Sequence, residues 1–407
     1  MTDIADRAGS VASGLFLAGV VLLPVMQVRV GIGAVDLVAA DLAFMLAGVA
    51  TLVAVAAGRL RVKRTLFAAT LMGYAGAVVI ALLAGGMTRT TLSGAAAGVY
   101  VTGLAALGHQ LVPHAVVPER FLRAFVAGTA VAVGAVLVGI VLFYAGLELP
   151  RENRFVGAYG AVPSGRYPRV IGTFVNPNLL CNFLVCGLVA GLTAGRLGVI
   201  SRRLSAALVP ATLVAVGFTL SPGIGGALLA AGVWLWAFPA LRSHAFRRAA
   251  LVAGVAGAVA FLVLTTVKLD LDDGVQRSHR VRAWEDAGER FVDHPIVGVG
   301  LDENLAHVEH GNDLVTDAHN MWLSVAGQMG VIGVAAIGAV FVAPFADAER
   351  RRRIWRQPLA GGLAVALLGA LAYHGLSMSV EDARHLWIVL GVLAGLAYAD
   401  SEVIDVS

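Results

Sequence analysis

Residues 124–146 read AFVAGTAVAVGAVLVGIVLFYAG, a stretch in which no side chain is charged. A helix needs roughly 20 apolar residues to cross the hydrocarbon core of a bilayer, and this stretch is long enough. Eleven further apolar runs cover residues 11–28, 34–57, 65–86, 92–112, 177–195, 205–220, 224–241, 249–267, 319–345, 358–375 and 385–399. The sequence therefore predicts an all-α polytopic membrane protein of about twelve transmembrane helices. These form a single domain over residues 1–407.

The composition excludes a water-soluble globular fold. The chain is 58% hydrophobic and 14% charged, with a mean hydropathy of +0.82. Soluble domains are about 45–50% apolar and about 25% charged. The same values exclude a disordered, collagen-like or disulfide-stapled chain. The two cysteines, Cys181 and Cys186, lie in one apolar run and are expected to pack as small apolar side chains.

The basic residues support a specific orientation in the membrane. With a cytoplasmic N-terminus, 18 of the 30 Lys and Arg residues fall near that terminus or in cytoplasmic loops, and every such loop is basic. This asymmetry follows the positive-inside rule. We therefore expect a protein of the plasma (inner) membrane with cytoplasmic N- and C-termini. The net charge of +4 reflects this topology and does not indicate a nucleic-acid partner.

A second group of basic residues lies on the predicted outer side, where the rule disfavours them. It comprises Arg151, Arg154, Arg166 and Arg169 in one loop and Lys268, Arg277, Arg280, Arg282 and Arg290 in residues 268–318. Clustered arginines on this side favour an anionic partner. Residues 268–318 form the long extracytoplasmic loop, inserted between the ninth and tenth predicted spans.

An amphipathic helix is predicted within this loop, over residues 279–293 (HRVRAWEDAGERFVD). Its apolar stripe consists of Val281, Trp284, Gly288 and Phe291. Ser278 is expected to cap the start of the helix, and Pro295 to end it. Such a helix is expected to lie on the outer membrane surface or on the bundle.

Three stretches on the predicted outer side carry polar residues at distinctive spacings. The first, Arg169-Val-Ile-Gly-Thr-Phe-Val-Asn-Pro-Asn178, opens the sixth span. The second is Arg280-Val-Arg-Ala-Trp284, followed by His294-Pro-Ile-Val-Gly-Val-Gly300. The third is His319-Asn-Met-Trp-Leu323, with Gly330 further along the tenth span.

Together the three stretches resemble the O-antigen ligase and polymerase superfamily of membrane glycosyltransferases. That family shows R-x-x-G-T-F-x-N-P-N, then R-x-x-x-W with H-P-x-x-G-x-G, then H-N-x-x-L after a large outer loop. The motif-bearing resemblance covers residues 169–330, whereas the first five spans match in hydropathy alone. The resemblance implies a GT-C-like helical bundle. It also implies transfer of a glycan from a polyprenyl diphosphate carrier to an acceptor hydroxyl on the extracytoplasmic face, with membrane lipids as surroundings.

The resemblance also implies roles for individual residues. The family's general base maps to His319, and its phosphate-binding arginine maps to Arg280. Substrate-binding residues are expected among Arg169, Arg282, Arg166, Arg154, Arg151, Asn320, Asn178 and Trp284. No cofactor and no metal are expected.

These residue types suit the implied chemistry independently of the family. A sugar hydroxyl is a poor nucleophile at neutral pH, and an imidazole near its own pKa is a suitable general base. A lipid diphosphate leaves without a general acid if arginines stabilise its developing charge, each contact contributing about 1.5–3 kcal/mol. Displacement with inversion at the anomeric carbon requires no covalent intermediate.

Each assignment has a structural alternative. His319 is equally placed for a backbone contact at a helix start, and Arg280 for an interfacial position with its charged end in water. Arg169 is also suited to anchor the sixth span. Asn176-Pro177-Asn178 is typical of a helix-start turn, since Asn caps helices and Pro fits the first helical position.

One position departs from the family pattern. Relatives often carry Ser-Arg in the outer turn between the seventh and eighth spans, whereas this chain reads Ser221-Pro222. A candidate phosphate contact is therefore missing, and Arg151 or Arg154 would have to replace it.

Other functions remain open from the sequence. A polysaccharide polymerase of the same superfamily would use a second lipid-linked glycan as acceptor, and the intact H-N-x-x-L stretch favours the ligase. A twelve-span secondary transporter is disfavoured because the long loop is outside and no half-to-half repeat is visible. An alternative metal site would draw on His307, Glu309, His310 and His319, or on Asp270 and Asp272.

Overall fold

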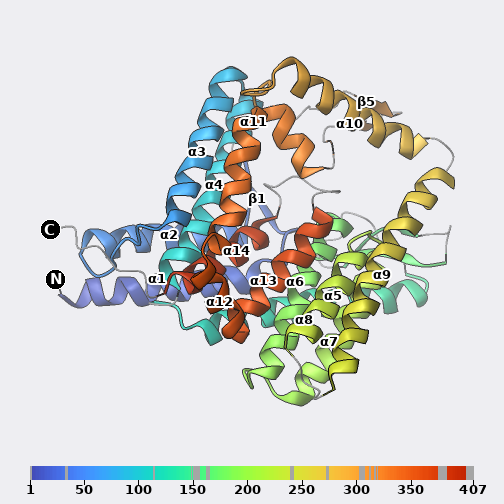
Figure 1. The fold of residues 1–407 in the computed structure, drawn as a ribbon, viewed down its shortest axis with the longest axis horizontal. Helices are drawn as coiled ribbons and strands as arrows, with labels where there is room; N and C mark the ends of the chain where they lie inside the picture. The colour runs from blue at the N-terminus through green and yellow to red at the C-terminus, as the bar shows by residue number, and fades with distance from the viewer. Residues whose placement is uncertain are drawn as a thin grey trace. The chain divides into compact units, whose positions relative to one another are not determined.

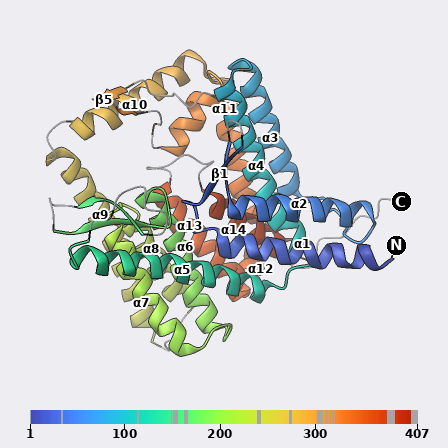
Figure 2. The same cartoon turned by 180° about the vertical axis from the view of Figure 1, so that it is seen from behind.

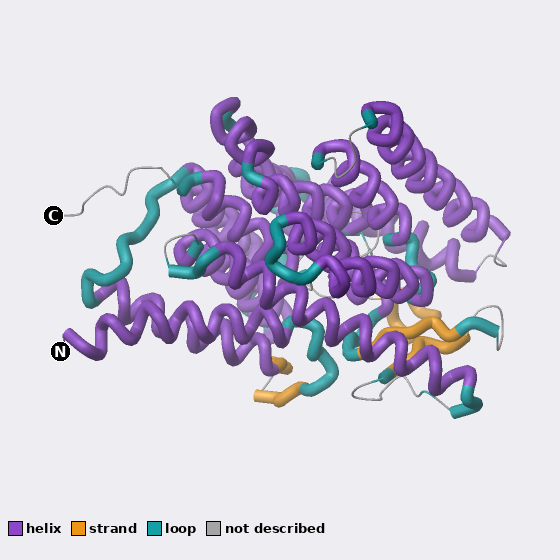
Figure 3. Tube along the Cα trace, turned by 90° about the horizontal axis from the view of Figure 1, so that it is seen from below, coloured by secondary structure: helices purple, strands orange, loops and turns teal. Residues whose placement is uncertain are grey.

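The computed structural model describes residues 2–32, 35–112, 115–147, 149, 156–161, 166–238, 243–271, 275–301, 308–310, 313–315, 318, 320–374 and 383–399. The backbone alone is described for residues 2–8, 31, 32, 35, 36, 159–161, 261, 262, 264–271, 275–281, 308–310, 313–315, 373 and 374. The described part of the chain is predominantly helical (Figure 3). Its strands form three antiparallel hairpins: β1 (Arg29–Ile32) with β2 (Val35–Val38), β3 (Gly157–Ala161) with β4 (Pro168–Gly172), and β5 (Val308–His310) with β6 (Asp313–Val315).

Each apolar run identified in the sequence folds as a helix. In chain order these are α1 (Thr2–Leu22), α2 (Ala39–Ala56), α3 (Leu66–Ala84), α4 (Arg89–Leu111), α5 (Pro118–Tyr144), α6 (Pro177–Arg196), α7 (Arg202–Phe218), α8 (Ile224–Ala237), α9 (His244–Leu271), α11 (Met321–Val342), α13 (Pro358–His374) and α14 (Arg384–Ala397). The predicted all-α membrane class is thus confirmed.

The number of membrane spans is less settled than the number of apolar helices. Among the described residues, six helices are long and apolar enough to cross a bilayer: α2, α3, α4, α5, α6, and α11 with the short η1 (Ala343–Phe345). A seventh span results if α12 (Ala348–Arg356) and α13, which meet at 105°, form one broken span. Helices α8 and α14 have 14 residues each. At 1.5 Å per residue they extend about 21 Å, less than the roughly 30 Å hydrocarbon core. Twelve spans therefore remain a prediction.

The predicted amphipathic helix is present but begins earlier than expected. It is α10 (Val275–Asp293), which includes Ser278 within its first turns. The prediction that Ser278 caps the helix is therefore wrong, because the apolar stripe alone does not mark where a helix starts. Its end before Pro295 agrees with the prediction.

The chain divides into two compact units, each assembled from segments far apart in sequence. Unit 1 comprises residues 1–62, 110–261 and 353–373, and unit 2 comprises residues 63–109, 262–352 and 374–407. The predicted single domain over residues 1–407 remains a prediction.

Unit 1 is built around α6, which is buried along almost its entire length. Helix α1 packs along α2 (Figure 2), and α5 packs against both α1 and α6. A row of aromatic rings with centroids 5.3–6.4 Å apart runs through this core and consists of Phe16, Phe121, Phe125, Phe183 and Phe174. Helix α13 is tied to α6 by a hydrogen bond from Asn182 Nδ2 to the Ala370 carbonyl, 3.0 Å. This rigid core supports the turn at the start of α6.

In unit 2, helices α3, α4 and α11 lie side by side (Figure 1). The fully buried Trp387 of α14 joins them, with its ring 5.4 Å from Tyr74 of α3 and 6.4 Å from Phe341 of α11. Helix α10 packs on α11. Unit 2 therefore holds the second and third motif stretches on adjoining elements.

Candidate functional site

Helix α11 is broken at Gly330, and this break organises the site in unit 2. Gly330 has φ 59° and ψ −159°, so the helical hydrogen bonds across it are lost. An unpaired backbone group inside a membrane protein costs several kcal/mol. Such a break therefore needs partners from another part of the chain.

The second motif stretch supplies those partners. The amides of Val299 and Gly300 donate to the carbonyls of Gly327 and Gln328, 2.9 and 3.0 Å away. On the other side of the break, the carbonyls of residues 295 and 296 accept from the amides of residues 331 and 332, at 2.8 and 3.3 Å. Two carbonyls before the break and two amides after it, four groups in all, are thus paired with residues 295–300.

Glycine is required where these backbones meet. Gly298 has φ +70°, and a Cβ on it would overlap the backbone of Gln328. A Cβ on Gly330 would overlap the backbone of Ile296, and one on Gly300 would overlap Gly85 of the same unit. The glycines of the two motifs therefore form one interlocked joint, which sets the direction of the first half of α11.

The residues on either side of His319 in the chain are both fixed by hydrogen bonds. The carbonyl of the fully buried Ala318 accepts from Trp284 Nε1 of α10, 2.8 Å away. Asn320 caps α11, because its Oδ1 accepts from the amides of Trp322 and Leu323, 3.0 and 3.2 Å away. His319 itself lies outside the described residues.

Helix α10 carries the predicted arginines of this unit. Arg280 lies on its backbone one helical turn before Trp284, and Arg282 is exposed. Further along, Arg290 pairs with Asp286 at 3.0 Å. The structure thus links Trp284 to the chain next to His319, whereas the side chain of Arg280 lies outside what is described.

The first motif stretch lies in unit 1, where β4 leads into α6. Asn176 caps α6 through a bond from the Asn178 amide, 2.7 Å, and Pro177 occupies the first helical position. The predicted helix-start turn is therefore confirmed. It leaves the Asn178 side chain, which is 7% exposed, free of any role in capping.

Asn178 is the centre of a buried polar cluster. Its Oδ1 accepts from Arg169 Nη2 at 3.3 Å and from Ser221 Oγ at 3.0 Å. Arg169 Nε also donates to the carbonyl of Thr219, 3.2 Å away. The Asn178 amide oxygen thus accepts two side-chain hydrogen bonds within the cluster.

The turn that departs from the family pattern belongs to this cluster. Leu220 adopts φ +46°, an uncommon conformation for a residue with a side chain, and Ser221 is fully buried. Thus Ser221-Pro222 does not present a charge here, but its serine holds the amide that contacts Arg169. Sequence reasoning missed this role of Ser221, since only the fold brings residues 178 and 221 together.

The other arginines predicted to bind substrate in unit 1 are either exposed or not described. Arg166 is exposed, and its carbonyl accepts from the Tyr144 hydroxyl at 3.2 Å. Arg151 and Arg154 lie outside the described residues. Within the parts of the chain that are described, no group of three His, Cys, Asp or Glu side chains is placed to hold a metal. The alternative metal site lies outside those parts: His307, His319 and Asp272 are not described, and Asp270, Glu309 and His310 are described in their backbone alone.

Comparison with known proteins bears on the same stretches. Residues 204–338 match the family described as O-Antigen ligase, and they include the second and third motif stretches. This match supports the O-antigen ligase superfamily. The chain is similar to the O-antigen ligase of Pseudomonas aeruginosa, with 29% identity over 122 residues, which are 30% of this chain and 30% of that relative. The alignment thus spans under a third of the relative's length.

The match confirms the resemblance drawn from the motifs. The first motif stretch, residues 169–178, lies before the matched segment of the superfamily. Its interpretation as part of the candidate site therefore depends on the sequence pattern and on the hydrogen bond between Arg169 and Asn178.

Proposed function

We propose that this protein is an O-antigen ligase-like glycosyltransferase. It moves a glycan from a polyprenyl diphosphate carrier to an acceptor hydroxyl on the outer face of the inner membrane. The family match over residues 204–338 and the order of the three motif stretches support this assignment.

His319 serves as general base in this proposal. The observation that carries it is the 2.8 Å bond from Trp284 to the Ala318 carbonyl. This bond connects Ala318, the residue before His319, to Trp284 on α10. Trp284 lies one helical turn after Arg280, so the same helix carries Arg280 and holds the chain next to His319. A base held on a fixed backbone is favoured because misplacement of about 1 Å slows a reaction strongly.

The reaction is a single displacement. The acceptor hydroxyl loses its proton to the His319 imidazole while its oxygen forms a bond to the anomeric carbon. The bond from that carbon to the diphosphate oxygen breaks, and the electron pair leaves with the diphosphate. The sugar is inverted, and neither a metal nor a covalent intermediate is needed.

Arginines stabilise the leaving diphosphate. Arg280 is the principal contact in this proposal, and Arg282 on the same helix is a further one. In unit 1, Arg169, Arg166, Arg154 and Arg151 are proposed as substrate-binding residues. The side chains of Arg169 and Asn178 are held by a network of hydrogen bonds and carry N–H donors. Charge-assisted bonds of this kind contribute about 1.5–3 kcal/mol each.

A ligase and a polymerase would catalyse the same glycosyl transfer and differ only in the acceptor. A ligase uses the hydroxyl of a lipid, and a polymerase uses a second lipid-linked glycan. Mass analysis of lipid-linked glycans in cells lacking the gene distinguishes them. Accumulated long chains are expected for the ligase, and accumulated single repeat units would show a polymerase. Unchanged lipid-linked glycans would contradict glycan transfer and favour a transporter.

Complementation with variants tests the residues. We expect His319→Ala and Arg280→Gln to abolish transfer while the protein still inserts into the membrane. His244→Ala is the matched control, because His244 is exposed at the start of α9 and lies on the predicted inner side. Transfer retained by His319→Ala would refute the general-base role.

A further inference from the structure

Helix α12 differs from every other described helix in its charge. Its residues read AERRRRIWR, and five of the nine are arginines: Arg350, Arg351, Arg352, Arg353 and Arg356. It meets the apolar α13 at 105°. Residues 358–375 are a predicted span, and a helix at this angle to that span would run along the membrane surface.

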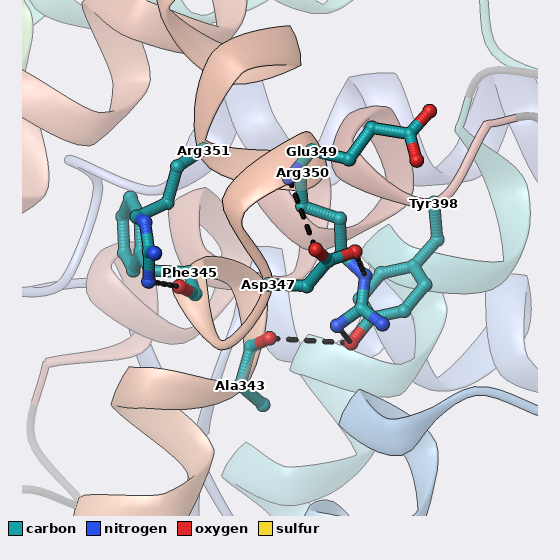
Figure 4. A network of polar contacts seen from close by, with 7 residues as sticks. All are labelled: Ala343, Phe345, Asp347, Glu349, Arg350, Arg351 and Tyr398. Carbon is teal, nitrogen blue, oxygen red and sulfur yellow. Dashed lines mark hydrogen bonds and ion pairs between the residues drawn. The ribbon is translucent and has the colours of Figure 1, made fainter.

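The first turn of α12 is fixed by Arg350 (Figure 4). Its guanidinium lies 4.3 Å from the centre of the Tyr398 ring and donates to the Tyr398 hydroxyl at 2.7 Å. That hydroxyl donates to the Ala343 carbonyl at 3.2 Å, and Asp347 lies 3.6 Å from Arg350. Arg350 is therefore committed to holding the helix in place.

Two arginines on the solvent-exposed face of α12 differ from Arg350 in their surroundings. Arg352 and Arg356 are exposed, one turn apart, and meet no carboxylate among the described residues. Like charges at this spacing destabilise a helix by a few tenths of a kcal/mol. Trp355 is 44% exposed beside them, whereas Ile354 is fully buried on the other side. The face thus combines unpaired arginines with an exposed indole.

We infer that the exposed face of α12 binds the headgroups of anionic phospholipids. Phosphate oxygens match the donor geometry of guanidinium groups, and an indole is favoured at the depth of the headgroups. Binding would also relieve the repulsion between Arg352 and Arg356. The site is separate from the proposed glycan-transfer site and does not depend on it. On the predicted topology it faces the cytoplasmic leaflet.

Lipid titration of the purified full chain in detergent tests this site. Native mass spectrometry counts bound phosphatidylglycerol and, as the zwitterionic comparison, phosphatidylcholine with the same acyl chains. We expect the wild-type protein to prefer phosphatidylglycerol. The variant R352Q/R356Q lacks two positive charges and should bind phosphatidylglycerol about 30-fold more weakly, since each basic residue contributes about 1 kcal/mol. R352K/R356K keeps the charge and should bind within about 3-fold of the wild type.

The matched control is R202Q/R203Q, which removes two exposed arginines from the start of α7. It should bind phosphatidylglycerol as the wild type does. Equal binding of both lipids by the wild type, unchanged binding by R352Q/R356Q, or an equal loss in R202Q/R203Q would each overturn the proposal. If R352Q/R356Q fails to fold, the salt dependence decides. Wild-type binding that does not weaken between about 50 and 500 mM salt would refute an electrostatic site.

Discussion

The joint between residues 295–300 and the broken helix α11 predicts the effect of a single methyl group. In Gly298→Ala the new Cβ overlaps the backbone of Gln328, so the two segments must separate. The bonds from Val299 to Gly327 and from Gly300 to Gln328, 2.9 and 3.0 Å, are then lost.

The cost can be worked out from these contacts. A side chain at φ +70° costs roughly 1 kcal/mol. Each of the two lost hydrogen bonds costs about 1–3 kcal/mol, because its donor and acceptor are left buried. The sum of roughly 4 kcal/mol is a large part of the 5–15 kcal/mol that holds a typical protein folded. We therefore expect Gly298→Ala to lower the melting temperature markedly.

Gly288→Ala is the matched control. Gly288 lies inside α10 of the same unit, and a Cβ there meets nothing within 4 Å. Alanine should stabilise this helix by about 1 kcal/mol. Thermal unfolding in detergent compares the two variants, and hydrogen exchange reports the amides of residues 299 and 300. Equal stability of the two variants, with unchanged exchange at those amides, would refute the joint.

Three further predictions concern single polar contacts. Trp284→Phe keeps the ring but removes the donor to Ala318, so we expect a loss of about 1–3 kcal/mol in thermal unfolding and slower glycan transfer; unchanged transfer would contradict the proposed support. Ser221→Ala removes one of two donors to Asn178 and should cost about 1 kcal/mol, measured the same way, and a neutral effect would show that the cluster does not contribute to stability. Burial lowers the pKa of Lys63 to about 8. The folded chain then releases this proton at lower pH than the unfolded chain, so stability rises between about pH 8 and 10.5, by up to about 3 kcal/mol, and Lys63→Met should abolish the rise in melting temperature seen over that range.

Hydropathy predicted the helices because apolar runs in a bilayer have few alternatives to a helix. It could not predict how these helices divide into spans. Helix α14 has 14 residues, every one from His385 to Ala397 buried, so it reads as apolar whether it crosses a membrane or fills the interior of a bundle. The basic helix α12 was not predicted either, since four consecutive arginines have no apolar period.

The candidate site was predicted in part. The motif glycines Gly298, Gly300 and Gly330 were visible in the sequence, but their mutual pairing depends on backbone geometry that spacing does not reveal. The contact between Asn178 and Ser221 joins residues 43 positions apart, and no local sequence pattern predicts it. By contrast, the cap formed by Asn176 and Pro177 followed from local rules and is confirmed.

The interleaving of the two units has a consequence for biogenesis. Unit 1 draws its last segment from residues 353–373, and unit 2 draws its last from residues 374–407. Synthesis proceeds from the N-terminus, so α3 and α4 enter the membrane long before their partners in residues 262–352 exist. Gly98 of α4, which meets Val78 of α3 in the folded chain, is therefore made before those partners. Assembly of both units must therefore finish after most of the chain has been made, and truncation before residue 353 should leave neither unit complete.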